Sequence, residues 1–232
     1  MRTFLIHCSI VVAILLLELP ICISGFAAKK KGASRKKKNA SASTKKGFGA
    51  PSPKLDDTIL GKFVSRMPNN ADETDCPCGT GRKYVDCCGP FHRKEKTCLT
   101  MTDVLRSRYT AFSWRNIQYI IETTNEACRD YRNDQIAWAK DMDKAGMFDS
   151  FDFVSLEAGP EEEGGLNDNE GFITFKVTLR AKEDTSFAVA GQETVVSERS
   201  RFLRDLKTGV WSYAGGDVRS EVIGLEDTIL NV

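Results

Sequence analysis

Histidine is nearly missing from this sequence: the 232 residues include only two, His7 and His92. Histidine is the side chain that most often moves a proton at neutral pH. Because His7 falls in an N-terminal leader, a histidine-based catalytic mechanism is nearly excluded. Long apolar runs are missing too. The best candidate, Phe4–Leu17, falls short of the roughly 20 apolar residues that cross a bilayer, so we expect no stable membrane span, with a retained anchor as the alternative.

Acidic residues are scarce in one part of the chain and abundant in the rest. Of the 33 basic and 32 acidic residues, eleven basic ones but only one acid, Glu18, lie in residues 1–55, so residues 56–232 carry a net charge of −9. The total charge of +1 therefore arises because the positive charge of residues 1–55 cancels the negative charge of the rest of the chain. An acidic body repels nucleic acid, and we expect the mature protein to bind none. A nucleic-acid role would require the basic leader to be retained.

The leader has the features of two successive targeting segments. Arg2, a short apolar run and small residues before Phe26 are typical of a secretory signal peptide over residues 1–25. Residues 26–55 are basic, contain serine and lack acids, which predicts a disordered, transit-like segment. The order resembles the bipartite plastid presequences of algae with secondary plastids, where a Phe at the cut site recurs. This resemblance implies plastid import; secretion, the endomembrane lumen and a functional basic arm are the alternatives.

Four of the eight cysteines crowd together after a linker over residues 56–75. Adjacent Cys87 and Cys88 cannot easily bridge each other, and a disulfide between Cys76 and Cys78 would close a strained ring. Four thiolates at this spacing fit one tetrahedral Zn²⁺ without strain. We therefore expect these four cysteines to form a zinc site that is closed to water and structural rather than catalytic. A disulfide cluster or a redox dithiol is the alternative.

The C-x-C-x8-C-C pattern, with Cys-Pro-Cys-Gly at its start and Cys-Cys-Gly at its end, resembles the SEC-C motif. That motif is best known at the end of the preprotein translocase motor SecA, where the knuckle docks onto a chaperone. The resemblance implies a SEC-C zinc knuckle over residues 76–98 that binds a protein partner. His92 could replace a ligand, although a solvent-exposed loop histidine is the simpler expectation. Cys98 and Cys128 are expected to be small buried hydrophobes.

Apolar periodicity divides the rest of the chain into helices followed by strands. One stripe at helical spacing predicts a first helix with a capped start: Met101, Val104, Leu105, Tyr109 and Phe112. Two more helices are expected, over residues 117–128 and 133–145. Alternation of period two then predicts a short strand at 151–153, a loop over 159–170, and strands over 173–179, 194–204 and 210–214. Helices followed by an antiparallel sheet indicate an α+β domain with the helices on one sheet face.

Two arginine-containing strings sharpen this prediction: LRSRYTAF over Leu105–Phe112 and ERSRFL over Glu198–Leu203. With the knuckle before them and Trp211–Tyr213 behind them, they resemble the YchJ family of bacteria and plastid-bearing organisms. The resemblance implies a nuclear transport factor 2-like domain over residues 99–218, in which helices wrap a curved antiparallel sheet around a conical pocket. A C-terminal tail over residues 219–232 would follow.

The sequence departs from that family in two places. Bacterial members often carry a second knuckle at the C-terminus, whereas residues 217–232 contain no cysteine. The aromatic-His-Pro string that they tend to show after the second helix is replaced by Thr123–Glu126. We therefore assign no role that depends on that histidine or on a second metal.

Alternation along the 194–204 strand sends Glu198 and Ser200 to one face and Arg199 and Arg201 to the other, and one set must face the concave side. The candidates for lining the pocket are Arg106, Arg108, Tyr109, Glu198, Arg199, Ser200, Arg201, Trp211 and Tyr213. A carboxylate beside a hydroxyl and arginines could serve acid–base chemistry or bind an anion. The favoured expectation is structural: an ion pair between Glu198 and an arginine of the first helix.

Two functions from different classes follow. The first is a non-enzymatic, zinc-binding adaptor of the YchJ type that docks a protein partner through its knuckle, where small basic islands flank the metal. The second is a small-molecule binder or an enzyme that uses the conical pocket. Because no nucleophile–base pair is visible in the sequence, the adaptor is preferred.

Overall fold

The computed structural model describes residues 63, 65–144, 147–164, 169–184 and 188–222. Its centre is one antiparallel sheet of four strands in the order β1-β2-β3-β4, each paired with the next along the chain. The strands are β1 (Phe151–Glu163), β2 (Glu170–Ala181), β3 (Glu193–Arg204) and β4 (Trp211–Val222). The predicted signal peptide, transit segment and most of the tail lie outside the described residues.

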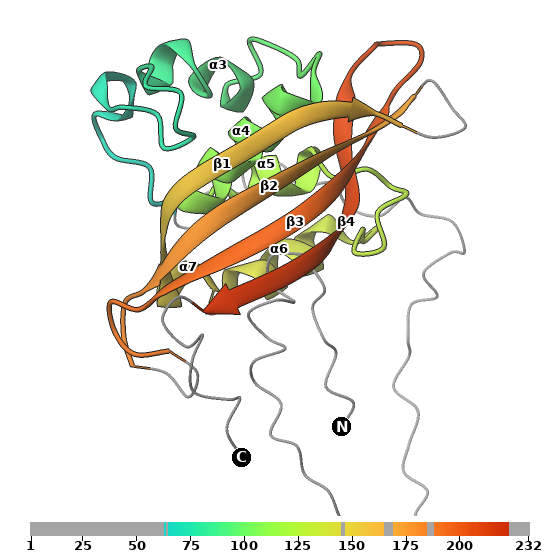
Figure 1. The fold of residues 1–232 in the computed structure, drawn as a ribbon. Helices are drawn as coiled ribbons and strands as arrows, with labels where there is room; N and C mark the ends of the chain where they lie inside the picture. The colour runs from blue at the N-terminus through green and yellow to red at the C-terminus, as the bar shows by residue number, and fades with distance from the viewer. Residues whose placement is uncertain (1–62, 64, 145–146, 165–168, 185–187, 223–232) are drawn as a thin grey trace, which may run out of the picture.

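Helical segments precede the sheet along the chain. They are η2 (Ala71–Glu73), η3 (Tyr84–Asp86), α3 (Gly89–His92), α4 (Met101–Ser113), α5 (Ile117–Glu122), α6 (Gln135–Lys144) and α7 (Met147–Ser150). Figure 1 shows α4, α5 and α6 behind one face of the curved sheet, with α3 and the chain before it beyond the β1 edge. The predicted order of helices followed by an antiparallel sheet is confirmed. Within the described ranges, no helix is long and apolar enough to cross a bilayer.

Helix α4 lies between the sheet and the cysteine-rich segment and contacts both. It starts with a reciprocal capping box, in which Asp103 N donates to Thr100 Oγ1 at 3.0 Å and Thr100 N donates to the Asp103 carboxylate at 3.3 Å. Beyond the predicted apolar stripe, its polar residues Ser107 and Thr110 are also buried. One side of α4 faces the sheet and another faces the cysteine-rich segment, so the helix is covered more fully than one stripe predicts.

Strand β1 is longer than predicted because its position in the sheet tolerates a proline. The sequence indicated a strand ending at residue 153 and a loop from residue 159, yet β1 runs through Pro160 to Glu163. Among the described strands β1 lies at the edge of the sheet, where a residue without a backbone N–H is tolerated. Two register shifts against β2 bend the strand further.

The second predicted helix is shorter than expected, because the chain leaves it to join the sheet. Helix α5 ends at Glu122, and Thr124 then forms a parallel bridge with Tyr213 of β4. Asn125 N donates to Tyr213 O at 2.7 Å beside this bridge. At its other end, β4 continues to pair with β3 as far as Val222, beyond the domain boundary expected at residue 218.

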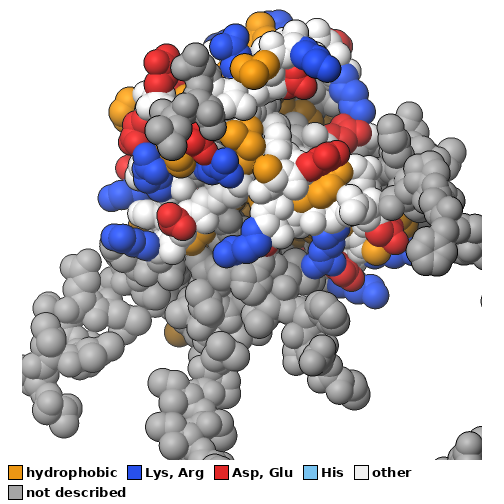
Figure 2. Space-filling view, turned by 90° about the vertical axis from the view of Figure 1, so that its right-hand side faces the viewer, with side chains coloured by type: hydrophobic (Ala, Val, Ile, Leu, Met, Phe, Trp, Pro, Cys, Tyr) orange, Lys and Arg blue, Asp and Glu red, His pale blue; other side chains and the backbone are white. Residues whose placement is uncertain are grey.

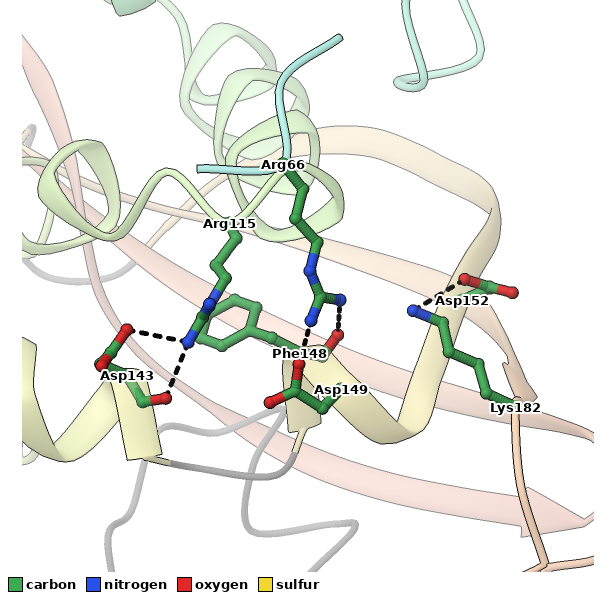
Figure 3. A network of polar contacts seen from close by, with 7 residues as sticks. All are labelled: Arg66, Arg115, Asp143, Phe148, Asp149, Asp152 and Lys182. Atoms are coloured by element: carbon green, nitrogen blue, oxygen red, sulfur yellow. Dashed lines mark hydrogen bonds and ion pairs between the residues drawn. The ribbon is translucent and has the colours of Figure 1, made fainter. Parts of the chain in front are cut away.

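The end of the predicted linker is fastened to the domain. Arg66 N donates at 2.8 Å to the carbonyl oxygen of Trp114, the residue that caps the end of α4. The Arg66 guanidinium donates to Phe148 O and to the carboxylate of Asp149, both on α7 (Figure 3). The chain therefore already contacts the domain at Arg66, before Cys76, and this segment joins the end of α4 to the start of the sheet.

Candidate functional site

The cysteine-rich segment folds around tight turns that require glycine. Gly79 and Gly81 have φ values of +78° and +73°, in the left-handed region that other residues enter at a cost. Cys76 N donates to Arg82 O at 2.8 Å, which closes the loop between the first cysteine pair and η3. The second pair follows η3, and Cys88 is the residue that caps the start of α3. These turns fold the two cysteine pairs back onto each other.

The four cysteine sulfurs converge. The Sγ atoms of Cys76, Cys78, Cys87 and Cys88 all lie within 4.8 Å of one another. Those of Cys78 and Cys87 are 3.4 Å apart, and those of Cys87 and Cys88 are 4.0 Å apart. Zn–S bonds of about 2.3 Å in a tetrahedral site separate the sulfurs by about 3.8 Å, so the cluster fits Zn²⁺. All six cysteines within the described ranges are free, which argues against the disulfide alternative.

The four sulfurs act on one another's pKa values through hydrogen bonds. Hydrogen bonding to Cys76 lowers the pKa of Cys78, and hydrogen bonds to Cys76 and Cys78 raise the pKa of Cys88. The hydrogen bond to Cys78 raises the pKa of Cys76 to about 11. A bound divalent cation overrides these opposing shifts, because ligation favours the thiolate form of every ligand.

Hydrogen-bond donors surround the sulfurs. From the knuckle itself, Thr80 Oγ1 lies 3.1 Å from Cys87 Sγ, and Arg82 Nη2 donates to the same sulfur at 3.6 Å. From α4, Thr110 Oγ1 donates to Cys88 Sγ at 3.3 Å. These donors offset the negative charge that four thiolates would carry, which suits a metal centre rather than a cluster of neutral thiols.

The knuckle is packed into the domain and does not project from it. The exposed fraction of each of the four cysteines is 5% or less, and they share one core cluster with sheet residues such as Ile173. Arg106 Nη1 donates to Cys78 O at 2.6 Å. The ring of Tyr84 meets that of Trp114 edge-on, with centroids 4.8 Å apart. The knuckle and the α+β domain therefore form one folded unit.

His92 is half-buried on α3, so the expectation of a solvent-exposed loop histidine is wrong. Its Nε2 lies 2.9 Å from Ser107 O, which can only accept, and its Nδ1 lies 3.0 Å from Tyr84 Oη. The neutral ring satisfies both partners, with Nε2 donating and Tyr84 donating to Nδ1. Burial lowers the pKa of His92, which favours this neutral form. Both nitrogens are engaged away from the sulfurs, so His92 supports the fold rather than the metal.

Acids neutralise most of the positive charge near the knuckle. Four ion pairs lie there among the described residues: Lys83–Asp75 at 2.8 Å, Arg93–Glu95 at 2.8 Å, Arg93–Asp72 at 3.2 Å and Lys94–Glu122 at 2.9 Å. On the face drawn in Figure 2, basic and acidic side chains are also interspersed. The basic islands expected to mark a docking surface are therefore largely salt-bridged, and Arg82 is exposed with its guanidinium on a cysteine sulfur.

A cavity lies between α4 and the inner face of the sheet. Five of the predicted pocket residues line it: Arg108, Tyr109, Glu198, Ser200 and Tyr213. Apolar side chains that the sequence did not single out for this role complete the wall: Leu105, Phe112, Phe153, Phe175, Val177 and Phe202. The cavity measures about 30 Å³, which holds about two water molecules and is far too small for a metabolite.

Glu198 is the buried charge of this cavity, with an exposed fraction of 1%. Its Oε1 accepts hydrogen bonds from Ser200 Oγ at 2.5 Å and from Tyr213 Oη at 2.9 Å. Gly216 gives the carboxylate its space, because a Cβ at that position would collide with Oε1. Burial raises the pKa of Glu198, since the apolar surroundings disfavour the charged form.

The predicted ion pair between Glu198 and an arginine of the first helix is not formed. Arg108 lies in the same cavity, but its Nη1 donates to Ile120 O at 2.7 Å and to Thr123 Oγ1 at 2.8 Å. Its guanidinium carbon lies 4.5 Å from the centre of the Tyr213 ring. Arg108 therefore reaches the carboxylate through Tyr213, and its own hydrogen bonds go to the end of α5.

Four predicted pocket residues lie outside the cavity: Arg106, Arg199, Arg201 and Trp211. Arg199 and Arg201 instead line a second, open hollow of about 290 Å³. Arg106 faces the knuckle, as described above. The alternation along β3 buries Glu198 and Ser200, so the two arginines between and after them face outward, where Arg199 pairs with Glu162 at 2.8 Å. Trp211 is half-buried at the start of β4, and its N donates to Cys98 O at 2.9 Å.

Sequence reasoning missed Thr110 and Gly216. Thr110 follows Arg106 by four residues, and residues four apart lie on the same face of a helix. This spacing was the signal in the sequence that could have placed Thr110 beside Arg106. The sequence marks Gly216 less clearly, because its contact with Glu198 depends on the register between β3 and β4.

Comparisons with known proteins agree with this geometry. The family model described as "YchJ, middle NTF2-like domain" matches residues 100–216, and the SEC-C motif matches residues 75–90. The chain belongs to the YchJ family. This membership confirms the predicted nuclear transport factor 2-like fold and the SEC-C motif before it.

Relatives of this YchJ-family chain include bacterial proteins. A UPF0225 protein of Vibrio parahaemolyticus is 32% identical over 149 residues, which is 64% of this chain and 77% of its own. One of Corynebacterium glutamicum is 30% identical over 143 residues, 62% of this chain and 96% of its own. The solution structure of a SEC-C motif containing protein from Rhodopseudomonas palustris has a TM-score of 0.48 and 28% identity, covering 62% of this chain and 98% of its own.

We predict that Glu198→Gln gains stability relative to the wild type as pH rises. Burial raises the folded-state pKa of Glu198 above its ordinary value of 4.5, so the folded protein keeps a proton that the unfolded chain releases. The contribution of Glu198 to stability is therefore full below pH 4.5 and is lost as pH rises toward the folded pKa. Urea unfolding of metal-loaded samples at about pH 5 and about pH 8 should show a relative gain of at least about 1 kcal/mol for the variant. A difference that stays constant with pH would contradict this.

Proposed function

We propose that this YchJ-family protein is a zinc-binding adaptor that holds a protein partner at its knuckle. The observation that carries the proposal is the convergence of four buried sulfurs within 4.8 Å of one another. A closed site of four thiolates keeps no position for a water or a substrate. Zinc held by Cys76, Cys78, Cys87 and Cys88 contributes folding energy, and no reaction is assigned to it.

The small size of the cavity beside Glu198 supports an adaptor over an enzyme that would use Glu198 and Ser200. The Ser200 hydroxyl and the Glu198 carboxylate are in contact at 2.5 Å, but a volume of about 30 Å³ has no room for a substrate beside them. A metabolite would need the cavity to enlarge, against the packing of six apolar side chains from α4 and the sheet. A reaction at Glu198 and Ser200 is therefore less well supported than interaction at the surface. The open hollow of about 290 Å³ beside Arg199 and Arg201 remains as a place for a small ligand.

The exposed rim of the knuckle is the surface that we assign to the partner. Arg82 and Lys83 are exposed on the loop over the metal site, while the cysteines beneath them are buried. At the end of the knuckle, Leu99 has an exposed fraction of 59%. Because the loop takes its shape from the gathered sulfurs, metal binding and partner binding should be linked.

We predict that the purified protein contains one zinc per chain and that removing it with a chelator lowers the melting temperature, because metal ligation stabilises only the folded state. Elemental analysis and thermal unfolding check this. Cys87→Ser removes one ligand and should lose most of the zinc. Cys128→Ser, which changes a buried cysteine outside the cluster, should retain it. Full zinc content in Cys87→Ser would overturn the ligand assignment.

The partner surface can be tested without disturbing the metal. We predict that Lys83→Glu loses the proteins that co-purify with the wild type, because it reverses the charge of an exposed knuckle residue whose ammonium pairs with Asp75 rather than with a cysteine sulfur. Arg219→Glu makes the same charge reversal at an exposed residue of β4 and should retain them. Zinc content, measured in parallel, should be equal in the three proteins. Identical sets of co-purifying proteins in all three would count against the adaptor.

We also propose import into a plastid, which residues 1–55 alone support through an apolar segment followed by an acid-poor basic one. A fluorescent protein fused behind residues 1–55 should label the plastid of an alga with a secondary plastid. Label in the endomembrane lumen or the medium would instead support secretion and end the plastid proposal.

A further inference from the structure

Two side chains of α4 reach into the knuckle from the neighbouring domain. Arg106 and Thr110 lie one helical turn apart and meet Cys78 and Cys88 respectively. Each contact joins residues that are more than twenty positions apart in the sequence. The surroundings of the metal site are thus completed by a part of the chain that contributes no ligand to it.

The Thr110 hydroxyl is directed at the sulfur cluster. Thr110 is completely buried, and its Oγ1 lies 3.3 Å from Cys88 Sγ and 3.6 Å from Cys76 Sγ. A thiolate that holds a metal can only accept a hydrogen bond, and a hydroxyl has a single hydrogen to donate. The shorter distance therefore selects Cys88 as the sulfur that Thr110 serves when the metal is bound.

Arg106 acts on the backbone of the first cysteine pair. Its Nη1 donates to Cys78 O at 2.6 Å, which holds the turn after Cys78 against α4. The next residue, Gly79, lies close to β1, since a Cβ there would be 3.6 Å from Leu156 O. The α+β domain thereby fixes Cys78 through its carbonyl oxygen and Cys88 through its sulfur.

We propose that Thr110 and Arg106 are positioning residues of the metal centre, so that the α+β domain sets part of the zinc affinity of the knuckle. The proposal rests on the metal-binding half of the proposed function and is independent of any partner. Thr80 and Arg82, inside the knuckle, already serve Cys87. Thr110 gives Cys88 its hydroxyl donor from across the domain boundary. Groups that hold metal ligands from outside typically change metal affinity by about 10- to 100-fold.

The test compares zinc dissociation constants of full-length variants by competition with a chromogenic chelator. Thr110→Val keeps the shape of the side chain but removes the hydroxyl, and we expect zinc to bind at least about 10-fold more weakly. Thr110→Ser restores the hydroxyl and should bind within about threefold of the wild type. Thr102→Val makes the same exchange on a half-buried residue of the same helix and should leave the affinity unchanged.

A second measurement separates this role from packing alone. In cobalt-substituted protein, Thr110→Val should shift the sulfur-to-cobalt absorption, because the charge on one thiolate changes. Thr110→Ser and Thr102→Val should not shift it. If Thr110→Val lowers the melting temperature of the metal-free protein but leaves both the zinc affinity and the cobalt spectrum unchanged, Thr110 is a packing residue and the inference is wrong. If the wild type itself binds no zinc, the proposed function fails first.

Discussion

The burial of α4 between the sulfur cluster and the sheet is the constraint on which the rest of the structure depends. A helix covered on both sides must find a hydrogen-bond partner for each of its polar groups. Arg106 and Thr110 find theirs in the knuckle, and Ser107 O accepts from His92. Arg108 finds its partners at the end of α5. The arginines and hydroxyls of the LRSRYTAF string therefore serve as links between elements, and this explains why so polar a string lies in the core.

Glu198, another buried polar group, is stabilised in a different way. Hydroxyl groups rather than a cation surround its carboxylate, so burial favours its neutral form. A neutral carboxyl costs far less to bury than an unpaired charge. The alternation of β3 then separates Glu198 and Ser200, which face the core, from Arg199 and Arg201, which face outward. The residues of the ERSRFL string thus alternate between the two faces of β3, and only those on the buried face line the cavity.

Features governed by neighbouring residues were predictable from the sequence, and features governed by distant contacts were not. The spacing of the cysteines indicates the sulfur cluster, and periodicity indicates helices before the sheet. The extent of β1 was underestimated because residues 159–170 are rich in Gly, Asn and Glu, and because a proline such as Pro160 is tolerated in a strand only at an edge. The environment of His92 depends on Ser107, fifteen residues away. The missing ion pair of Glu198 depends on the partners of Arg108, which donates instead to Ile120 O and to the hydroxyls of Thr123 and Thr124.

The edge position of β1 also bears on how this protein behaves at high concentration. A long, flat edge strand offers a row of unpaired backbone groups to a second molecule and can start aggregation. Here Pro160 removes one backbone N–H donor, and the two register shifts make the spacing of the backbone groups along β1 irregular. The strand also ends in three acidic residues, Glu161–Glu163. Two molecules that approach edge to edge meet broken hydrogen-bond spacing and like charges. The same irregularities that hid this strand from sequence patterns thereby help to keep separate copies of the chain apart.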